Sequence, residues 1–186
     1  MNQYFIEKYK FCPSCKNELT LKNGALCCSS CGFCKYNNPS SCVTIIVVQD
    51  GKILLGKRAI EPQKDYWDSP GGFIDSGETA AEAIHREMKE ETNLDIEIID
   101  FFGTIADTYA GAPTIALNYE VKIIGGKMKA QDDVAELKWF DLNDLPAKIA
   151  FENTKQALEM AKKKYILDPE FFKKNSAGMK DTAYAK

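Results

Sequence analysis

The chain has 186 residues, of which 45% are hydrophobic and 27% are charged, and its net charge is −3. This length suits one medium-sized globular domain with a small addition. The weakly negative charge argues against a chain built to attract polyanions, and no stretch is long and apolar enough to span a membrane.

The N-terminal residues MNQYFIEKYK are too charged for a secretory signal, so we expect the protein to be cytoplasmic. All seven cysteines lie before Val43. In a reducing compartment, this clustering favours a metal site over disulfides.

Two C-x2-C pairs, separated by twelve residues, predict a structural Zn²⁺ site within residues 1–38. The four ligands are Cys12, Cys15, Cys28 and Cys31. Four thiolates leave no open position for a substrate, and so short a segment needs the metal in order to fold. Cys27 and Cys34 leave an ambiguity, because Cys31 and Cys34 have the same spacing; Gly32, directly after Cys31, favours the chosen pair.

Zinc ribbons often bind nucleic acid, but the charge of this one argues against it. Residues 1–41 hold five lysines and two glutamates, or +3, and zinc with four thiolates contributes −2, which leaves about +1. We therefore expect no nucleic-acid partner. Tyr36 and Phe33 could instead line part of a nucleotide pocket, although Phe33 could equally pack on the main domain.

Residues 37–41 indicate a linker, and residues 42–49, rich in β-branched side chains, indicate a strand. Asp50-Gly51 predicts a hairpin turn, with a return strand over residues 52–58. A loop follows as far as residue 64, and Trp67 is expected in the core.

The stretch from Gly72 to Leu94 carries the strongest functional signal. Residues 69–72, Ser-Pro-Gly-Gly, predict a turn whose backbone can approach a ligand closely. Thr79 and Glu82 form a capping box at the start of a helix. The apolar side of this helix is formed by Ala83, Ile84 and Met88.

Glu87, Glu90 and Glu91 share one face near the C-terminal end of that helix, where the macrodipole disfavours carboxylates. Arg86 and Lys89 offset only part of this charge. A divalent cation, Mg²⁺ or Mn²⁺, is the simplest partner for such a cluster. A solvated, salt-bridged helix face is the alternative.

This stretch resembles the Nudix box, G-x5-E-x7-R-E-U-x-E-E-x-G-U, where U is a bulky aliphatic residue. The matching residues are Gly72, Glu78, Arg86, Glu87, Met88, Glu90, Glu91 and Leu94. Asn93 replaces the last glycine, and asparagine is the next best residue for the left-handed conformation that ends a helix. The resemblance implies the Nudix fold, an α/β/α sandwich with a mixed sheet, and Mg²⁺-dependent hydrolysis of a nucleoside diphosphate linked to another group.

The resemblance also implies roles for the residues of the box. The ligands of the catalytic cation are Glu87, Glu91 and the carbonyl of Gly71. Glu90 is expected to act as a ligand through water or as the general base. Arg86 is expected to pair with Glu78 and to hold the loop to the helix, for which an ordinary surface ion pair is the alternative.

The general base comes from different places within the family. Glu136 matches a glutamate that contributes to metal binding in zinc-ribbon relatives. Asp132 and Asp133 are loop alternatives, for which simple solvation is the expected state. His85 is expected at an exposed helix position without a catalytic role. The predicted catalytic set is Arg86, Glu90, Glu91 and Glu136.

After the box, strands are predicted over residues 95–106, 114–124 and 134–140, with a loop over 107–113 and a helix over 151–166. Residues 169–186 have no apolar period and are expected to be poorly ordered. The predicted α/β organisation is therefore a zinc ribbon (1–38), a Nudix domain (39–168) and a C-terminal tail (169–186).

A zinc ribbon directly before a Nudix domain resembles the NADH pyrophosphatase group. Tyr36 aligns with a substrate-contacting tyrosine there, but the S-Q-P-W-P-F-P motif of that group is absent from residues 106–113. Tyr109 and Pro113 match the spacing of neither the dinucleoside polyphosphate hydrolases nor the ADP-ribose pyrophosphatases. ADP-ribose or a dinucleotide such as NADH is favoured, and the predicted substrate-binding residues are Tyr36, Arg58 and Tyr109.

The alternative function is a non-catalytic nucleotide-sensing module whose zinc ribbon binds nucleic acid or a protein. Sensors of this kind usually lose the box glutamates, and all of them are present here. We expect a nucleotide substrate as the small-molecule partner and no membrane, and a homodimer is left open.

Overall fold

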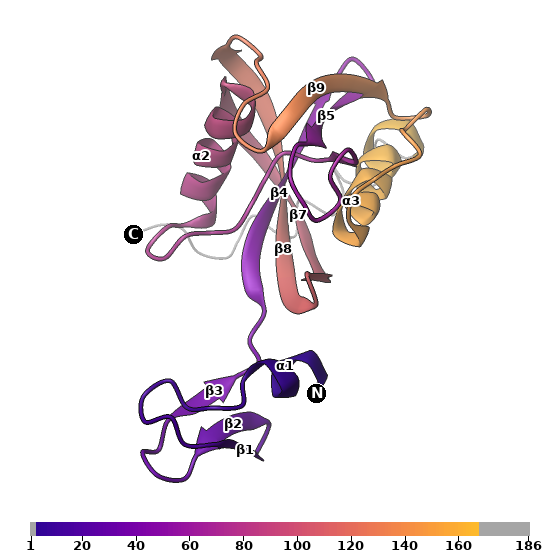
Figure 1. The fold of residues 1–186 in the computed structure, drawn as a ribbon. Coiled ribbons are helices and arrows are strands. Elements are labelled where there is room, and N and C mark those ends of the chain that lie inside the picture. Colours follow the sequence, from indigo (N-terminus) through magenta and orange to yellow (C-terminus); the bar gives the residue numbers. More distant parts are fainter. Residues whose placement is uncertain (1–2, 168–186) are drawn as a thin grey trace, which may run out of the picture.

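A mixed β-sheet lies between two helices, and a smaller cysteine-rich unit extends from one end of it (Figure 1). The structure is a computed structural model that describes residues 3–167. Its elements, in chain order, are α1 (Gln3–Lys8), β1 (Leu19–Lys22), β2 (Ala25–Cys28), β3 (Cys34–Tyr36), β4 (Ser40–Gln49), β5 (Lys52–Arg58), β6 (Trp67–Asp68), α2 (Ala80–Thr92), β7 (Leu94–Tyr109), β8 (Ala112–Gly126), β9 (Val134–Asp141), α3 (Glu152–Lys162) and a π-helical turn (Lys163–Leu167).

The larger sheet has six strands, with five in the order β6-β5-β4-β8-β7 and β9 also paired with β5. Neighbouring strands are antiparallel except β4 and β8, which run parallel. The turn between β4 and β5 has Asp50 and Gly51 in left-handed conformations, with φ values of 51° and 73°. This geometry confirms the predicted hairpin.

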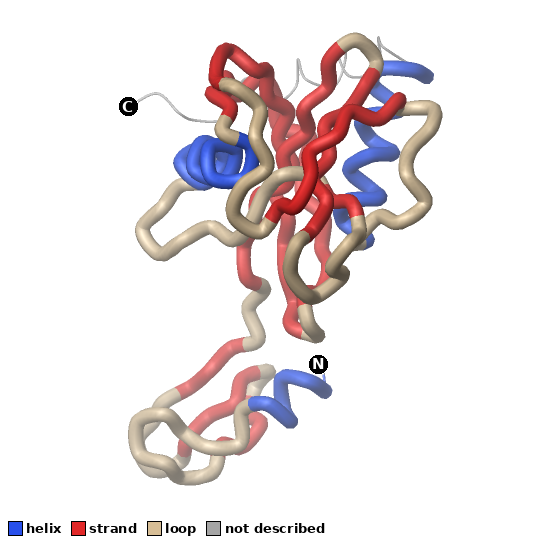
Figure 2. The backbone as a smooth tube through the Cα atoms, turned by 45° about the horizontal axis from the view of Figure 1, so that its top comes forward, coloured by secondary structure: helices blue, strands red, loops and turns tan. Residues whose placement is uncertain are grey.

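β4 divides the core between the two helices, which lie on opposite sides of the strands (Figure 2). Val43, Ile45 and Val47 pack on the side of α2. Ile46 packs on the other side with Leu158 of α3. Because both faces are covered, the apolar run of this strand is nearly continuous. The predicted α/β/α sandwich is confirmed.

The predicted loop over residues 107–113 is wrong. β7 and β8 continue through it as a hairpin, paired up to Tyr109, and only Ala110 and Gly111 form the turn. Both turn residues are left-handed, with φ values of 48° and 83°, as a two-residue hairpin requires. Pro113 does not break the strand, because it lies just before the stretch of β8 that pairs with β4 and therefore removes no hydrogen bond on that side.

The cysteine-rich unit consists of α1 and the three-stranded antiparallel sheet β1-β2-β3. Phe5, Ala25 and Leu26 are buried in it. This apolar interior is small for a unit of this length.

The predicted helix over residues 151–166 is confirmed as α3, but the regular helix ends at Lys162 and continues as the π-helical turn. Within α3, Leu158 and Ala161 are buried against the sheet. The predicted tail, residues 169–186, lies outside the described residues. Among residues 3–167, no helix is both long enough and apolar enough to cross a membrane.

Candidate functional site

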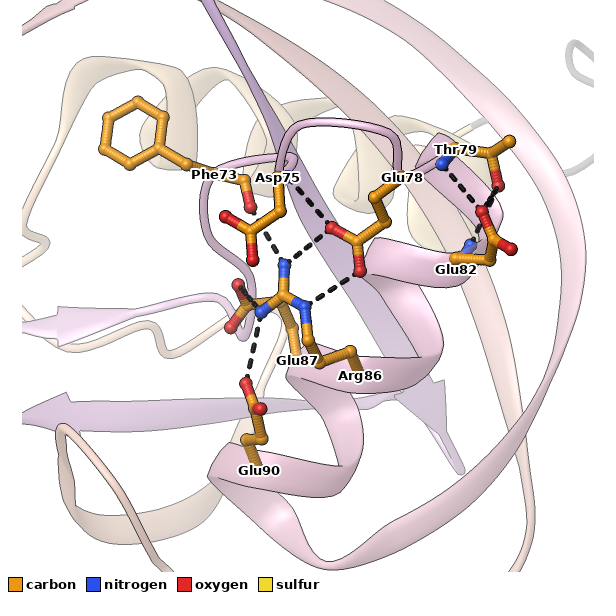
Figure 3. Close-up of polar contacts among 8 residues, drawn as sticks. All are labelled: Phe73, Asp75, Glu78, Thr79, Glu82, Arg86, Glu87 and Glu90. Atoms are coloured by element: carbon orange, nitrogen blue, oxygen red, sulfur yellow. Dashed lines mark hydrogen bonds and ion pairs between the residues drawn. The ribbon is translucent and has the colours of Figure 1, made fainter.

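The box helix α2 begins and ends as predicted. The Thr79 hydroxyl accepts a hydrogen bond from the Glu82 amide, and the Glu82 carboxylate accepts one from the Thr79 amide at 2.8 Å (Figure 3). This capping box satisfies two N–H groups that would otherwise lack partners. At the other end Asn93 is left-handed, with φ 58°, and its amide donates to the Lys89 carbonyl. Asparagine therefore replaces the usual glycine without breaking the cap.

Arg86 is the centre of a salt-bridge network beside the loop that precedes α2 (Figure 3). Its guanidinium group contacts both carboxylate oxygens of Glu78, at 2.8 and 2.9 Å, and donates to the Phe73 carbonyl at 3.0 Å. It also lies 2.7 Å from Glu87 and 3.1 Å from Glu90. Hydrogen bonds from Arg86 lower the pKa of the Glu78 carboxyl to about 2. The Arg86–Glu78 pair thus fastens the loop to the helix.

Glu87 and Glu91 are buried, with only 8% and 6% of their surface exposed. Both lie against residues 69–72: the Gly71 amide donates to Glu91 Oε2 at 3.0 Å, and a Cβ atom added to Gly72 would lie 2.3 Å from Glu87 Oε1. Only glycine leaves room for Glu87 at that position. Burial raises the pKa of both carboxyls, and it raises that of Glu91 well above its ordinary value.

Glu90 does not join this buried pair. Its side chain is 48% exposed, and its contact in the network is the 3.1 Å ion pair with Arg86. The three glutamates therefore divide: two turn inward to the loop, and the third lies at the rim of the site.

Two aspartates from outside the box lie near the buried glutamates. Asp133 precedes β9, Asp68 ends β6, and the charge of each raises the pKa of Glu91 further. Asp68, Asp133 and Glu91 line a small hollow together with Gly71. Asp133 was expected only as a loop alternative for the general base, and no sequence signal pointed to Asp68.

Asp68 is the most constrained of these acids. Burial raises its pKa to about 6, even though it accepts hydrogen bonds from the Ser69 amide and the Thr154 hydroxyl. It also lies 3.6 Å from the guanidinium group of Arg58. Asp68 therefore connects β5, β6 and the start of α3.

Glu136 is not brought to this hollow. It is exposed in β9, where its neighbour Leu137 and then Trp139 face the α2 side of the sheet, so Glu136 faces the other way. The acidic group that comes from this part of the chain is Asp133, in the loop before the strand. The only sequence feature that pointed to this loop was the pair Asp132-Asp133. Two acidic residues in a loop are equally well explained by simple exposure to solvent.

The donors at this hollow suit a hard divalent cation, because they are carboxylate and backbone groups. Ser69 adds a buried hydroxyl that has no hydrogen-bond partner within the described part of the chain. The carboxylate oxygens are more widely spaced than the thiols: in residues 3–167, the only group of three or more metal-binding side chains whose ligand atoms lie within 4.8 Å of one another is made of cysteines. A cation that binds Glu87 has to compete with Arg86.

A cleft of about 140 Å³ opens beside the acidic hollow, and Gly71 borders both. Two predicted substrate-binding residues, Arg58 and Tyr109, line this cleft. Tyr36 does not reach it: this side chain is 61% exposed on β3 and borders a separate hollow on the cysteine-rich unit.

Three aromatic rings, Phe73, Tyr109 and Phe151, form one side of the cleft, and we refer to them as the aromatic wall. The ring centroids of Phe73 and Tyr109 are 5.5 Å apart, and those of Tyr109 and Phe151 are 5.6 Å apart. The Arg58 guanidinium lies 5.0 Å from the centre of the Phe151 ring. No local sequence pattern connects Phe73 and Phe151 with Tyr109; only the fold brings both rings to it.

The predicted metal-binding cysteines are assembled. Cys12 and Cys31 Sγ atoms lie 3.5 Å apart, Cys15 and Cys28 Sγ atoms lie 3.4 Å apart, and all four fit within 4.8 Å. Backbone N–H groups, that of Cys31 first, lower the pKa of the Cys28 thiol and so favour the thiolate that a metal requires.

The expectation that the cysteines serve metal rather than disulfides is wrong for one pair. Cys27 and Cys34 face each other across β2 and β3, and their sulfur atoms are bonded. Their position in adjacent strands explains the pairing, because it brings the Cα atoms to 4.1 Å. The ambiguity over the ligand set is thereby removed in favour of Cys28 and Cys31.

Two further predictions concern residues outside the site. His85 is exposed on α2, as expected. Trp67 packs edge-on against Phe140, with ring centroids 4.7 Å apart, among residues of the core on the α3 side. Trp67 is thus partly buried and packs against the core, in line with the expectation.

Comparison with known proteins assigns most of this chain to one protein family. A family model described as the NUDIX domain matches residues 38–160. The chain is 41% identical over 122 residues to the ADP-ribose pyrophosphatase of Methanocaldococcus jannaschii, an overlap of 64% of this chain and 72% of that protein.

A second relative and a solved crystal structure are also similar to this chain. The chain is 28% identical over 146 residues to the NAD-capped RNA hydrolase NudC of Vibrio atlanticus; the overlap covers 77% of this chain and 53% of that protein, so the chain spans about half of its length. The crystal structure of a NUDIX hydrolase from Nitrosomonas europaea matches with a TM-score of 0.70, at 26% identity, over 84% of this chain and 93% of that one.

Proposed function

This chain belongs to the NUDIX domain family and is a hydrolase that acts on pyrophosphate bonds, and we propose that its substrate is ADP-ribose, cleaved with the help of a divalent cation. Water attacks one phosphorus atom, the P–O–P bond breaks, and the products are AMP and ribose 5-phosphate. Each product then carries one terminal phosphate.

The observation that carries this proposal is the buried pair Glu87 and Glu91 beside Gly71. Glu91 has no cationic side chain as a partner within residues 3–167 and accepts a hydrogen bond from the Gly71 amide. A buried carboxylate is costly unless it is protonated or meets a cation. Arg86 partly compensates Glu87, but no cationic side chain among the described residues compensates Glu91, which favours a cation and an anionic substrate at the adjoining cleft.

The proposed ligands of Mg²⁺ or Mn²⁺ are Glu87, Glu91 and the carbonyl of Gly71, with Asp133 as the fourth group in place of Glu136. When bound, such an ion neutralises the diphosphate and lowers the pKa of bound water. Glu90, which is exposed at the rim of the site and paired with Arg86, is the proposed general base.

The substrate class is supported by the aromatic wall. Base stacking on Phe73, Tyr109 or Phe151 would leave the diphosphate to extend toward Gly71, which borders both the cleft and the acidic hollow. ADP-ribose is our first candidate because of the similarity to the M. jannaschii ADP-ribose pyrophosphatase.

A dinucleotide such as NADH is the second candidate. It is favoured by the similarity to NudC of V. atlanticus, whose name refers to an NAD-containing cap. A nicotinamide or adenine ring would meet the same aromatic wall, so the geometry of the cleft does not separate the two candidates.

We also propose that the four cysteines bind one structural Zn²⁺ and that residues 1–38 fold as a separate small unit around it. Four sulfur ligands are typical of structural zinc and leave no position for a substrate.

The experiment is a substrate screen with Mg²⁺ or Mn²⁺. ADP-ribose, NADH, FAD, dinucleoside polyphosphates and nucleoside triphosphates are incubated with the enzyme, and the products are separated by chromatography. We expect AMP and ribose 5-phosphate from ADP-ribose at the highest kcat/KM. If the folded protein, supplied with metal, cleaves none of these compounds, the proposal is wrong. If it prefers NADH, a dinucleotide replaces ADP-ribose as the proposed substrate.

A further inference from the structure

The first turn of α3 borders the cleft and begins with an unfavourable residue. Its N-cap is Phe151, which makes no side-chain capping hydrogen bond. Ser, Thr, Asp and Asn are preferred there, because their side chains accept hydrogen bonds from the free N–H groups of the first turn. Phe151 instead places its ring in the aromatic wall. An unfavourable N-cap residue whose side chain lines a cleft indicates that this position serves the function of the site rather than the stability of the helix.

The missing cap is supplied from β7. Asp107 Oδ2 accepts a hydrogen bond from the Asn153 amide at 2.8 Å, and Asp107 Oδ1 accepts one from the Thr108 amide at 2.7 Å. A carboxylate at a helix N-terminus also interacts favourably with the macrodipole. Asp107 is therefore a cap from another element, about 50 residues away in the chain and tied to the hairpin that carries Tyr109.

Two other hydrogen bonds hold the same turn to the sheet. The Asn153 side-chain amide donates to Thr44 Oγ1 on β4 at 3.2 Å, and the Thr154 hydroxyl donates to Asp68 at the end of β6. The turn that follows Phe151 is thus attached to three strands, and every attachment lies within three residues of the ring.

We propose that Asp107 is a positioning residue: by holding the first turn of α3 against β7, it keeps the Phe151 ring beside Tyr109 and so sets the surface on which the nucleotide base stacks. Asp107 and Tyr109 lie two residues apart in β7 and therefore on one face of it. Of the three attachments of this turn, the contact from Asp107 to the Asn153 amide is the one that links it to the strand that carries Tyr109. This inference rests on the proposed function, because it takes the aromatic wall as the base-binding surface.

Asp107→Ala provides the test. We expect the KM for ADP-ribose and the inhibition constant of AMP to rise about tenfold, the usual effect of losing one charge-assisted hydrogen bond, with kcat within about twofold. Inhibition by inorganic pyrophosphate, which has no base to stack, should not change. Asp107→Asn can satisfy only one of the two N–H groups, so it should shift the same constants less, and it replaces the alanine variant should that one fail to fold by circular dichroism.

The control and the decisive measurement use two more variants. Glu97→Ala removes an exposed acid from the same strand and should leave every constant unchanged. In a protein that already carries Phe151→Leu, Asp107→Ala should raise the KM for ADP-ribose and the inhibition constant of AMP less than about twofold further. The reason is that Asp107 acts by positioning the Phe151 ring, which this background lacks.

The inference is overturned if Asp107→Ala leaves the KM for ADP-ribose and the inhibition constant of AMP unchanged. It is also overturned if the substitution raises them equally with Phe151 and with Leu at position 151, which would mean that Asp107 contacts the ligand directly. A third contrary result is an equal rise in the inhibition constant of pyrophosphate. Failure of the proposed function is a different outcome, in which the wild type itself cleaves no nucleotide; AMP binding measured by calorimetry would then still test Asp107.

Discussion

Glu91 is almost fully buried next to Gly71, and burial raises its pKa well above the ordinary value. The folded, metal-free protein therefore binds this proton more tightly than the unfolded chain does. The sign follows from linkage: the free energy of unfolding decreases as the pH rises from the ordinary carboxyl pKa through the raised one. Above that range the folded state carries a buried charge, which a divalent cation can stabilise.

The first prediction is that Glu91→Gln uncouples stability from metal binding. Glutamine keeps an oxygen for the Gly71 amide but has no charge to bury. In chelator at pH 8 we expect a higher Tm than that of the wild type, and Mg²⁺ should raise only the wild-type Tm. Activity should fall about 100-fold or more, since a proposed metal ligand is lost. Calorimetry with and without Mg²⁺, and product release, check these values.

Glu97→Gln, an exposed change of the same kind, is the control for Glu91→Gln. Should the Glu91→Gln enzyme keep its full kcat, or gain as much Tm from Mg²⁺ as the wild type, then Glu91 is not a ligand.

The second prediction separates two acids that are three residues apart. Asp133 lines the hollow with Glu91, whereas Glu136 is exposed on the opposite side of β9 from the α2 core. Asp133→Asn should raise the Mg²⁺ concentration needed for half-maximal activity about tenfold or more, and Glu136→Gln should change it less than about twofold. Metal titrations of both variants measure this, and the reverse ranking would restore Glu136 as the metal ligand.

At the scale of elements, the site depends on how closely the loop over residues 69–72 approaches α2. This loop is held on both sides. The Gly72 and Pro70 carbonyls accept hydrogen bonds from β4 at 2.9 and 2.8 Å, and Arg86 holds the following residues to the helix. The buried glutamates are therefore positioned by a rigid loop rather than by the helix alone.

The third prediction follows from this contact. Gly72→Ala adds a Cβ atom that would lie 2.3 Å from Glu87 Oε1, so the carboxylate or the loop must move. A displacement of this size at a proposed metal ligand should lower kcat/KM about 100-fold. Gly77→Ala is the matched control: it has nothing within 4 Å and is strained only by its positive φ of 87°, so it should cost stability but little activity. Steady-state kinetics and thermal melts distinguish the two, and equal activity in both would contradict the prediction.

At the scale of the whole molecule, the cysteine-rich unit and the large sheet are held together by different means. The sheet has two apolar clusters, one on each side, whereas the small unit has few buried apolar residues and four adjacent thiols. The residues that line the cleft all lie between Cys42 and Asn153, so none comes from the small unit.

The fourth prediction concerns zinc. Cys28→Ser should abolish binding of the proposed zinc ion and expose residues 1–38 to proteases, because such an ion would supply most of the folding energy of this small unit. Cys27→Ser should keep its zinc, since the Cys27 sulfur bonds to Cys34 instead. Metal analysis and limited proteolysis provide the readouts, and loss of zinc from both variants would show that the ligand set is different.

Local chemistry was readable from the chain. The capping box of Thr79 and Glu82, the left-handed Asn93 and the Asp50-Gly51 turn each depend on residues close in sequence, so their geometry follows from conformational preference alone. The spacing of the cysteine pairs and of the box glutamates is of the same kind, because it is set by a knuckle or by helical periodicity.

Contacts between distant segments were not readable in this way. Asp68, Asp133 and Glu91 lie together only because the fold brings the ends of β6 and α2 next to the loop before β9. Likewise, Phe151 contacts Tyr109 only because α3 packs across the sheet. The loop expected at residues 107–113 became a hairpin because pairing along β8 outweighs the local signals of Gly111 and Pro113.

The sequence by itself thus determined the fold class, the box helix with its caps and the cluster of four cysteines, because short-range backbone preferences and fixed spacings decide these features. Only the tertiary structure decided which carboxylates are buried, that Asp133 rather than Glu136 lies beside them, and which rings form the cleft. The physical reason is that burial and charge proximity depend on the packing of segments far apart in the chain, which no local pattern encodes.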